Sequence, residues 1–560
     1  MTFRPAEFEN FVATDTPSRQ RLFPQYGGWK NDFDIIVIGS GMGGGVLADD
    51  LGDRLSGQKR ILVLEAGSYL YPTHVFNICR FPNADVAGQF RCKNFWQPGN
   101  GGSEHYIHEQ PQMNFGGRSV FWSGLIPQIQ QWELDFFPGR VKNDLNHRYL
   151  AEAGVLMNES RTMGGTAQEM VQRFRQTSLN ADFEIRETPR ALHQPYLARE
   201  NAPPVTEFFV EPTGVFNTAE LLINNAGLTP GVHHGDHNGM FILLNHYVED
   251  IQRSNDNHYE LVVRNTLDGT ARHVHAGTVI LAGGSIESPK LLRRSSLFES
   301  LPGSVKGLVG RGLTDHPTTD WIRTCATHMG SLEISRNSHA KIVFYSRGHR
   351  DGDGRIRFPF NVEMNVNHEY WHLRDNDPTA PRSQQNDPCP GASPIEIKFS
   401  FGNCLDDGNE VKSAPPFGYV PEIAFRNLNW VHLLANERFP ALAGWQKSID
   451  DIWNELNGIA TRIFSEFQHN GAPVQPQGRL GQGKGFGFGT VHHAIGTLRM
   501  PHRTRYNADF QNTSVVDEDL QVIGAPNLYV CDMSVMPFSS AANPVRTLVG
   551  LALRMSHRFG

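Results

Sequence analysis

The sequence lacks the features typical of a membrane-spanning or nucleic-acid-binding protein. No run of about eighteen residues is both apolar and uncharged, so no transmembrane helix is predicted. The net charge is −7 without a sustained basic run, which argues against nucleic acid or an anionic membrane as the main partner. The chain contains no repeat and no low-complexity tract. Its 560 residues, 39% of them hydrophobic, are too many for one core, so two or more folded domains are expected.

Cysteine is scarce and irregularly placed. The six cysteines form no CxxC pair and show no regular spacing. This pattern predicts neither a zinc site nor a disulfide framework, and we expect buried or incidental thiols. The first twenty residues contain no apolar core of signal-peptide length and no twin arginine. We therefore expect a soluble, cytoplasmic protein. The six cysteines are Cys79, Cys92, Cys325, Cys389, Cys404 and Cys531.

Glycine, in contrast, is concentrated at one junction near the start of the chain. Residues 32–54, DFDIIVIGSGMGGGVLADDLGDR, contain six glycines. The β-branched run 34–39 predicts a short strand, the small and apolar spacing of 43–55 predicts a helix, and 60–67 predicts a second strand. This order within about 35 residues is the size of one parallel β-α-β crossover unit.

Three of these glycines fit a dinucleotide-binding pattern. Gly39, Gly41 and Gly44 form G-x-G-x-x-G, in which the first permits a tight turn, the second lets a pyrophosphate approach and the third allows close strand–helix packing. The pattern alone is weak, because glycine also serves ordinary turns. Glu65 ends the second strand and is placed to accept hydrogen bonds from an adenosine ribose. The alternative interpretation of Glu65 is a solvated carboxylate at a strand end. An acid there disfavours NADP and leaves FAD or NAD.

Similar sequence signals for strands, glycine turns and helices recur along the chain. We predict paired strands in 240–266, a strand, glycine turn and helix in 275–292, a helix in 445–467, a strand ending in a turn in 527–537, and a helix in 543–558. Because the nucleotide-type segments lie at both ends and in the centre, the domains are expected to be interleaved.

Five stretches in one order resemble the glucose–methanol–choline (GMC) oxidoreductases, FAD enzymes that oxidise alcohols. The resemblance fades between about 140 and 210 and between 325 and 485, where the substrate domain of the family varies. No single stretch is decisive, but five in one order make a chance resemblance improbable. The stretches are NFGGRSVFWSG (114–124), VILAGGSIESPKLL (279–292), VGRGLTDHP (309–317), VHHAIGTLRM (491–500) and NLYVCDMSVMPFSSAANPVRT (527–547).

The resemblance implies an α/β (α+β) protein in which a Rossmann-type FAD-binding domain is interleaved with a substrate-binding domain built on an antiparallel sheet with helices. The expected segments are an N-terminal extension (1–32), the FAD-binding domain (33–140, 205–320 and 505–560) and the substrate-binding domain (141–204 and 321–504).

The same resemblance assigns the cofactor-binding residues. The loop 116–124 is expected to run past the pyrophosphate to the flavin ring, and Val248 and Asp532 match positions near the adenine and near the phosphate or ribitol. Phe121 stands where some sugar oxidases of the family attach FAD through a histidine, and it has no nucleophilic atom, which implies non-covalent FAD. The implied set is Gly39, Gly41, Met42, Gly44, Glu65, Ala66, Gly117, Ser119, Trp122, Ser123, Val248, Asp532 and Pro544.

Alcohol oxidation needs a hydride acceptor, which flavin N5 supplies, and a base for the hydroxyl proton, for which a neutral histidine is suited. Of 24 histidines, the resemblance selects His493, whereas the neighbouring His492 is expected to point elsewhere if the segment is extended. Asn543 takes the partner position, as in pyranose oxidases and cholesterol oxidases. It can orient a hydroxyl but cannot act as the base, and a helix N-cap is the alternative role. No metal site is expected.

The substrate is less constrained. Residues 365–389 are rich in polar and aromatic groups, which suits a sugar, a glycoside or another polyol, although a solvated loop or lid is an equal interpretation. Oxidation of a sterol-like alcohol, lyase or decarboxylase chemistry on the same fold, and a binding protein without activity remain alternatives. Oxygen or another electron acceptor is expected to reoxidise the flavin, and an oligomer is possible.

Overall fold

The computed structural model describes seventeen ranges of the chain, and every structural statement below concerns these residues. They are 12–13, 32–55, 58–69, 97–98, 111–131, 133–160, 164–192, 215–227, 240–254, 258–336, 338–347, 360–367, 389–412, 421–424, 449–481, 492–501 and 513–559.

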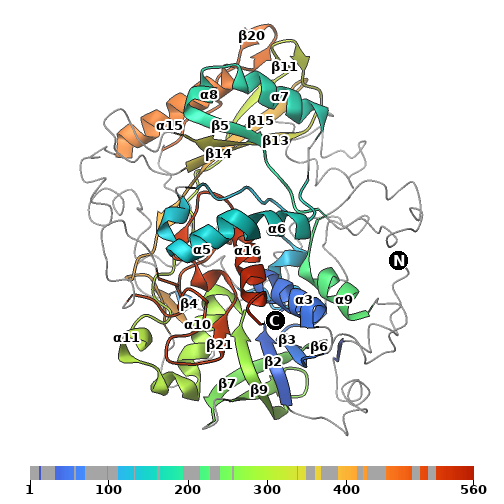
Figure 1. Ribbon diagram of the computed structural model, residues 1–560. Helices are drawn as coiled ribbons and strands as arrows, with labels where there is room; N and C mark the ends of the chain where they lie inside the picture. Colours follow the sequence, from blue (N-terminus) through green and yellow to red (C-terminus); the bar gives the residue numbers. More distant parts are fainter. Residues whose placement is uncertain are drawn as a thin grey trace.

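An eight-stranded, mostly parallel sheet forms the lower part of the molecule in Figure 1. At its centre lie β2 (Asp32–Ile38), α3 (Met42–Leu55) and β3 (Ile61–Leu64), the crossover unit predicted from the glycine-rich stretch. Every residue of β3 is buried, as is typical of a strand covered on both faces. The sheet order is β1-β6-β3-β2-β9-β8-β7, with β21 against β9. These other strands are β1 (Val12–Ala13), β6 (Met240–Leu243), β7 (His246–Arg253), β8 (Tyr259–Asn265), β9 (Ala271–Leu281) and β21 (Leu528–Val530).

The predicted pair of strands in 240–266 is divided between two kinds of pairing. Strand β6 runs parallel to β3, and only β7 forms the antiparallel pair with β8. The predicted strand–turn–helix of 275–292 is β9 followed by α10 (Gly284–Arg294), and the last predicted helix is α16 (Val545–Ser556), which packs against α3.

A five-stranded antiparallel sheet forms the second layer system, drawn in the upper part of Figure 1. Its apolar face packs under α7 (Gly165–Arg175) and α15 (Ile449–Phe464), and the ring of Phe174 lies 5.0 Å from that of Phe344 and 5.7 Å from that of Phe467. The order is β10 (Ile322–Ala326), β15 (Ser393–Phe401), β14 (Phe360–Val366), β13 (Ala340–Ser346) and β5 (Phe183–Glu187). Side chains alternate between the faces of a strand, so this sheet turns a second, more polar face towards the rest of the molecule.

The expected fold class is therefore confirmed: a Rossmann-type parallel sheet is combined with an antiparallel sheet and helices. The expected domain boundaries stay a prediction. Helices α5 (Gly139–Asp144) and α6 (Leu150–Leu156), joined by the π-helical turn η6 (Leu145–Tyr149), pack against α16 and share its core cluster. We therefore propose to move the first boundary from residue 141 to beyond Met157.

Short elements complete the described chain. The helical ones are η4 (Gly117–Val120), η5 (Glu133–Phe136), α8 (Leu179–Asp182), α9 (Thr218–Gly227), η8 (Ser296–Ser300), α11 (Gly303–Lys306) and η10 (Met533–Val535). The strands are β4 (Gln97–Pro98), β11 (His328–Met329), β12 (Leu332–Glu333), β16 (Asn403–Cys404), β17 (Glu410–Lys412), β18 (Glu422–Ala424), β19 (Gln468–His469), β20 (Ala472–Pro473) and β22 (Phe538–Ser539). None of the helices described is long and apolar enough to cross a bilayer.

Candidate active site

A cavity of about 540 Å³ lies where the carboxyl ends of β2, β3 and β9 approach the polar face of the antiparallel sheet. Thirteen of the fifteen residues selected from the sequence line it, which brings together segments from both ends and the centre of the chain. These residues are Gly39, Gly41, Met42, Glu65, Ala66, Gly117, Ser119, Trp122, Ser123, Val248, Asp532, His493 and Asn543. Gly44 and Pro544 do not line the cavity.

The glycine turn has the shape that a pyrophosphate requires. A Cβ on Gly41, which lines the cavity, would meet no atom within 4 Å, so the backbone faces open space there. A Cβ on Gly44 would lie 2.1 Å from the carbonyl oxygen of Gly39 and 2.7 Å from Cβ of Ala282. Gly44 therefore serves close packing, and the open space at Gly41 agrees with the expected close approach of a pyrophosphate, which stays a prediction. Gly117 lies beside Gly41, its added Cβ being 3.1 Å from the Gly41 Cα, so the loop 114–124 runs past this turn.

Glu65 ends β3 at the cavity wall. Its carboxylate accepts hydrogen bonds from the backbone nitrogen of Ser40 (3.1 Å), from Ser40 Oγ (2.6 Å) and from the backbone nitrogen of Gly67 (2.8 Å). Burial raises the pKa of Glu65, and these hydrogen bonds oppose the rise. The carboxylate is thus fixed in orientation at the position expected for a ribose contact.

Asp532 ties the end of β21 to the start of α10. It accepts hydrogen bonds from the backbone nitrogens of Gly284 (2.8 Å) and Ser534 (2.8 Å) and from Ser288 Oγ (2.5 Å). Burial raises the pKa of Asp532, and the same hydrogen bonds lower it. At the far end of the cavity, the Val248 carbonyl accepts a hydrogen bond from Arg294, so this part of β7 is fixed by α10.

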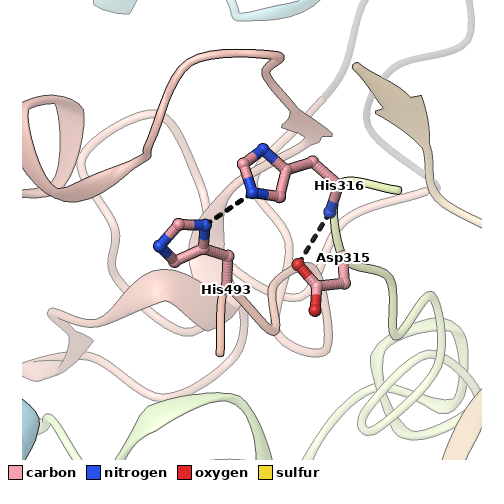
Figure 2. Close-up of side chains that lie close together, drawn as sticks. All are labelled: Asp315, His316 and His493. Carbon is pink, nitrogen blue, oxygen red and sulfur yellow. Dashed lines mark hydrogen bonds between the residues drawn. The ribbon is translucent and has the colours of Figure 1, made fainter. Parts of the chain in front are cut away.

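His493 is paired with a second histidine. Its Nδ1 lies 2.8 Å from Nε2 of His316, and its other ring nitrogen points away from His316 (Figure 2). Burial lowers the pKa of His493 well below 6.5, and the nearby charges of His316 and Lys398 lower it further. Burial and Lys398 also lower the pKa of His316 to about 4. Both rings are therefore neutral at pH 7.

Asp315 completes a group in which the ligand atoms of three residues lie within 4.8 Å of one another. The 2.8 Å separation of the two histidine nitrogens is a hydrogen-bond distance, shorter than the roughly 3.3 Å between two ligands of one tetrahedral ion. The Asp315 carboxylate accepts a hydrogen bond from the backbone nitrogen of His316 at 2.7 Å. We interpret the group as hydrogen-bonded side chains, and the absence of a metal site stays a prediction.

The expectation for His492 needs correction, and the alternative role of Asn543 stays open. The segment is not extended at His492, whose φ is 61°, and His492 lines the cavity together with His493, so the expected alternation does not turn it away. Helix α16 begins at Val545 with Pro544 as its N-cap and without a side-chain capping bond. Pro544 itself has helical backbone angles and its carbonyl accepts a 2.9 Å hydrogen bond from the Leu548 nitrogen, so Asn543 keeps the position of a possible cap while it lines the cavity.

Sequence reasoning missed four residues of the site. His316 lies in the quoted VGRGLTDHP stretch, where it received no role. Lys341, Glu363 and Lys398 come from β13, β14 and β15 and line the cavity from the polar face of the second sheet. The available signal was the period-two alternation of polar and apolar residues in β14 and in much of β15, which no motif marks. Of the polar segment 365–389, the residues up to Asn367 and Cys389 are described, and 368–388 lie outside the described residues.

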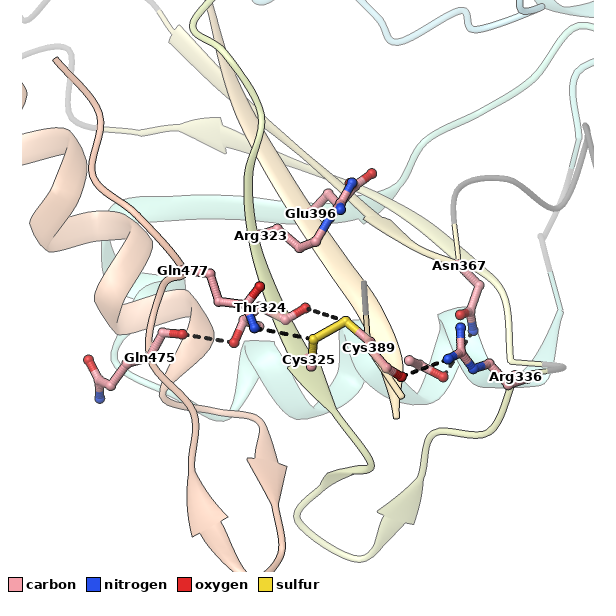
Figure 3. Close-up of a disulfide and its surroundings, with 10 residues drawn as sticks. Arg323, Thr324, Cys325, Arg336, Asn367, Cys389, Glu396, Gln475 and Gln477 are labelled. Atoms are coloured by element: carbon pink, nitrogen blue, oxygen red, sulfur yellow. Dashed lines mark hydrogen bonds and ion pairs between the residues drawn. A yellow bond between two sulfur atoms is a disulfide. The ribbon is translucent and has the colours of Figure 1, made fainter. Parts of the chain in front are cut away.

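The expectation of unpaired thiols is wrong for two of the six cysteines. Cys325, on β10, and Cys389, just before β15, form a disulfide (Figure 3). These strands are hydrogen-bonded neighbours in the antiparallel sheet, which places residues 64 apart in the sequence side by side. Regular spacing could not reveal the pair, because the partners meet only through the sheet register. Cys531 is a buried, free cysteine.

A glycine turn with an acid after the second strand, a neutral, partly buried histidine and a cavity between two sheets are the features expected of a flavoprotein oxidoreductase site. Two family models match the chain, both described as GMC oxidoreductase: the N-terminal one covers residues 231–318 and the C-terminal one residues 446–552. Both the N-terminal and the C-terminal part of the GMC oxidoreductase family are thus matched in this chain.

Comparison with solved structures supports the same fold. Pyridoxine 4-oxidase from Mesorbium loti superposes with a TM-score of 0.56 at 16% sequence identity, covering 94% of this chain and 99% of that chain. No curated protein matches the sequence. The protein is thus an FAD-dependent oxidoreductase acting on CH–OH donors, and its FAD is bound non-covalently.

Proposed function

We propose that the protein oxidises a CH–OH group of a sugar, glycoside or other polyol to a carbonyl, with His493 as the base. The observation that carries the proposal is the neutral His493 in the same cavity as the glycine turn and Asn543. Bound FAD supplies the hydride acceptor at N5. The residues of this chain bind the substrate, orient its hydroxyl group and take up the hydroxyl proton.

The hydrogen bond to His316 sets the tautomer of His493. If Nε2 of His493 takes the hydroxyl proton, then Nδ1 carries a hydrogen and donates it to Nε2 of His316. His316 acts as a positioning residue, because it holds the ring with its other nitrogen directed away from the pair. Its burial keeps it neutral, which preserves the acceptor nitrogen that this arrangement needs.

Asn543 is proposed to hold the substrate oxygen, since an amide donates and accepts hydrogen bonds but does not titrate near neutral pH. For the cofactor, we propose that Gly41 admits the pyrophosphate, Glu65 binds the adenosine ribose and Asp532 faces the phosphate or ribitol. The adenine is proposed to lie at Val248. The remaining lining residues of the selected set are proposed to contact FAD as well, and Gly44 and Pro544 to support it indirectly.

The polar wall favours a hydrophilic substrate. Lys341, Glu363 and Lys398 line the cavity beside Trp321. Buried charges are poorly matched to a sterol, which would leave them desolvated without polar partners. The retention of both His493 and Asn543 in one cavity favours alcohol oxidation over lyase or decarboxylase chemistry.

The compartment is revised by the disulfide. Disulfides persist in oxidising compartments and are rare in the cytosol of mesophiles. The Cys325–Cys389 bond therefore argues for an oxidising compartment in place of the expected cytoplasm. We propose oxygen or another small electron acceptor for reoxidation of the flavin.

Two measurements test the proposal. Acid precipitation of the purified yellow protein should release intact FAD into the supernatant, because Phe121 at the cavity wall offers no atom for covalent attachment. An anaerobic screen of alcohols and sugars should then find a substrate that bleaches the flavin. A flavin that stays with the precipitate contradicts non-covalent binding, and a flavin that no alcohol bleaches contradicts the proposed oxidation.

A further inference from the structure

The polar face of the antiparallel sheet places an unbalanced charge in the cavity. Nζ of Lys398 lies 3.4 Å and Nζ of Lys341 lies 4.0 Å from Oε2 of Glu363, whose Oε1 accepts a 3.1 Å hydrogen bond from Ser400 Oγ. Glu363 and Lys398 face each other in register across β14 and β15, so the sheet itself fixes their positions. One carboxylate therefore faces two ammonium groups.

These charges are largely removed from water. The side chains of Lys341, Glu363 and Lys398 are 16%, 10% and 14% exposed. Although burial raises the pKa of Glu363, Lys398 and Lys341 lower it to about 2, so the carboxylate is ionised at neutral pH. Burial lowers the pKa of Lys341 to about 8; the charges of Lys398 and Arg190 also lower it, whereas Glu363 raises it. Lys341 is therefore still mostly charged at pH 7.

An uncompensated cation in such a place is destabilising unless a ligand supplies the opposite charge. Asn365 lies two residues from Glu363 on the same face of β14 and pairs in register with Lys341. It is 2% exposed, and within the described part of the chain neither its side-chain nitrogen nor its oxygen has a hydrogen-bond partner. A second polar group beside the lysines thus has unused hydrogen-bonding capacity.

The cationic end of the cavity lies within electrostatic reach of the base. Lys398 contributes to lowering the pKa of both His493 and His316. Its Nζ also lies 5.1 Å from the ring centroid of Trp321, another lining residue. Lys398 and His493 therefore line one cavity, and a substrate bound there is exposed to both side chains.

We propose that Lys341 and Lys398, held in place by Glu363, bind an anionic group of the substrate, so that the preferred alcohol is a hydroxyl compound carrying a carboxylate, such as a sugar acid. The inference rests on the proposed function, because the hydroxyl is oxidised at the same site. The one cation left over by Glu363 matches the single charge of a carboxylate. A phosphate monoester shares the anionic chemistry and forms a separate arm of the test.

The test compares matched substrates by anaerobic stopped-flow bleaching of the holoenzyme at pH 7. Glucose and galactose are the neutral parents, glucuronate and galacturonate the carboxylates, and glucose 6-phosphate the phosphate arm. The measured quantity is the ratio of the second-order reduction rate of each acid to that of its parent. We expect the ratio to favour a uronate over its parent by roughly 10- to 100-fold, the range for a charge-assisted hydrogen bond.

Three variants separate binding from structural support. Lys398→Met should collapse the ratio towards one, and Glu363→Gln should raise it, because the second change removes a negative charge from the anion site. A purely structural ion cluster would lower both rates in both variants and leave the ratio unchanged. Lys306→Met is the matched control, since Lys306 pairs with Glu299 on η8 and does not line the cavity; it should change neither rate.

The outcomes distinguish the two proposals. Neutral sugars that bleach the flavin as well as their uronates do, with a ratio insensitive to Lys398→Met, overturn the anion site and leave the oxidation proposal standing. A preference for the phosphate arm alone overturns the carboxylate. If no alcohol bleaches the flavin, titration of the flavin absorbance with acetate decides: saturation that is lost in Lys398→Met supports the anion site, and no saturation overturns it.

Discussion

The two sheets meet at one cavity, but each sheet is stabilised within itself in a different way. The parallel sheet is built around close backbone approach: Gly39, with φ of 108°, and Gly44 leave no room for a side chain between β2, α3 and the end of β9. The antiparallel sheet has a conventional apolar face, a polar face and a disulfide that joins β10 to the segment just before β15. The first arrangement leaves room for backbone alone at the turn proposed to bind FAD, and the second presents polar side chains to the same cavity.

The largest expected effect concerns the glycine turn. Gly44→Ala places a methyl group 2.1 Å from the Gly39 carbonyl oxygen. Because both the methyl group and the carbonyl are fixed by the backbone, neither can move aside, and we expect loss of folded flavoprotein. Gly41→Ala meets no protein atom and should fold, but it should bind FAD more weakly because the methyl enters the space in front of the turn. Thermal unfolding and FAD content of both variants measure the difference. A Gly44→Ala protein as stable as the wild type would contradict the packing role.

The next effect concerns the second sheet. Replacing Cys325 and Cys389 by serine opens a loop of sequence separation 64, which costs about 4 kcal/mol by chain entropy. We expect a lower unfolding midpoint in denaturant for the antiparallel sheet, and a similar loss when the wild type is reduced. Cys531→Ser is the control for loss of a buried sulfur, because Cys531 is a free cysteine outside this sheet. Equal midpoints with and without reductant would show that the disulfide does not support this sheet.

Glu65 tests the cofactor side of the cavity. Glu65→Ala removes a carboxylate that is proposed to bind the ribose, so FAD should bind about 1.5–3 kcal/mol more weakly. The reduction rate of protein that remains loaded should change little, because the ribose lies far from N5. FAD affinity is measured by titration of the apoprotein. Unchanged affinity would contradict the ribose assignment, and Glu65→Gln should recover part of the loss.

The smallest expected effect is that of Asn543→Ala. An amide that only orients a hydroxyl contributes about 0.5–1.5 kcal/mol, so flavin reduction should slow by no more than roughly tenfold. The dependence of the rate on pH should stay as in the wild type, because the amide does not titrate. A loss as large as that expected for His493 would assign Asn543 a larger role than orientation.

The comparison also explains how much the sequence could predict. Gly39, Gly41, Gly44 and Glu65 were accessible because their roles are local: a turn, a strand end and a fixed spacing between them. His493 was selected only through the family resemblance, because one histidine among 24 carries little signal by itself.

Residues that meet only in the folded chain were missed. The antiparallel sheet brings Cys325 to Cys389, and Lys341 and Lys398 to Glu363, by placing their segments side by side, an arrangement that no motif in the sequence records. The left-handed backbone at His492 likewise overturned an argument from alternation, since alternation holds only in an extended segment.

The central claim is that His493 is the base, and the pH dependence of flavin reduction tests it most directly. Because the folded pKa of His493 is lowered, its ring is neutral at pH 7, and the wild-type rate should stay level there and fall only well below pH 6.5, as the ring takes a proton. His493→Ala should be slower by roughly 10²–10⁴-fold and should lack this acid limb.

His492→Ala is the neighbouring comparison: His492 also lines the cavity, but this variant should keep the acid limb, because His493 remains in place. The measurement is anaerobic stopped-flow bleaching of the three proteins with one accepted substrate between pH 4.5 and 8, a span of roughly two pH units on the acid side of an ordinary histidine. An acid limb that survives in His493→Ala, or a rate lost in His492→Ala and kept in His493→Ala, would contradict the assignment.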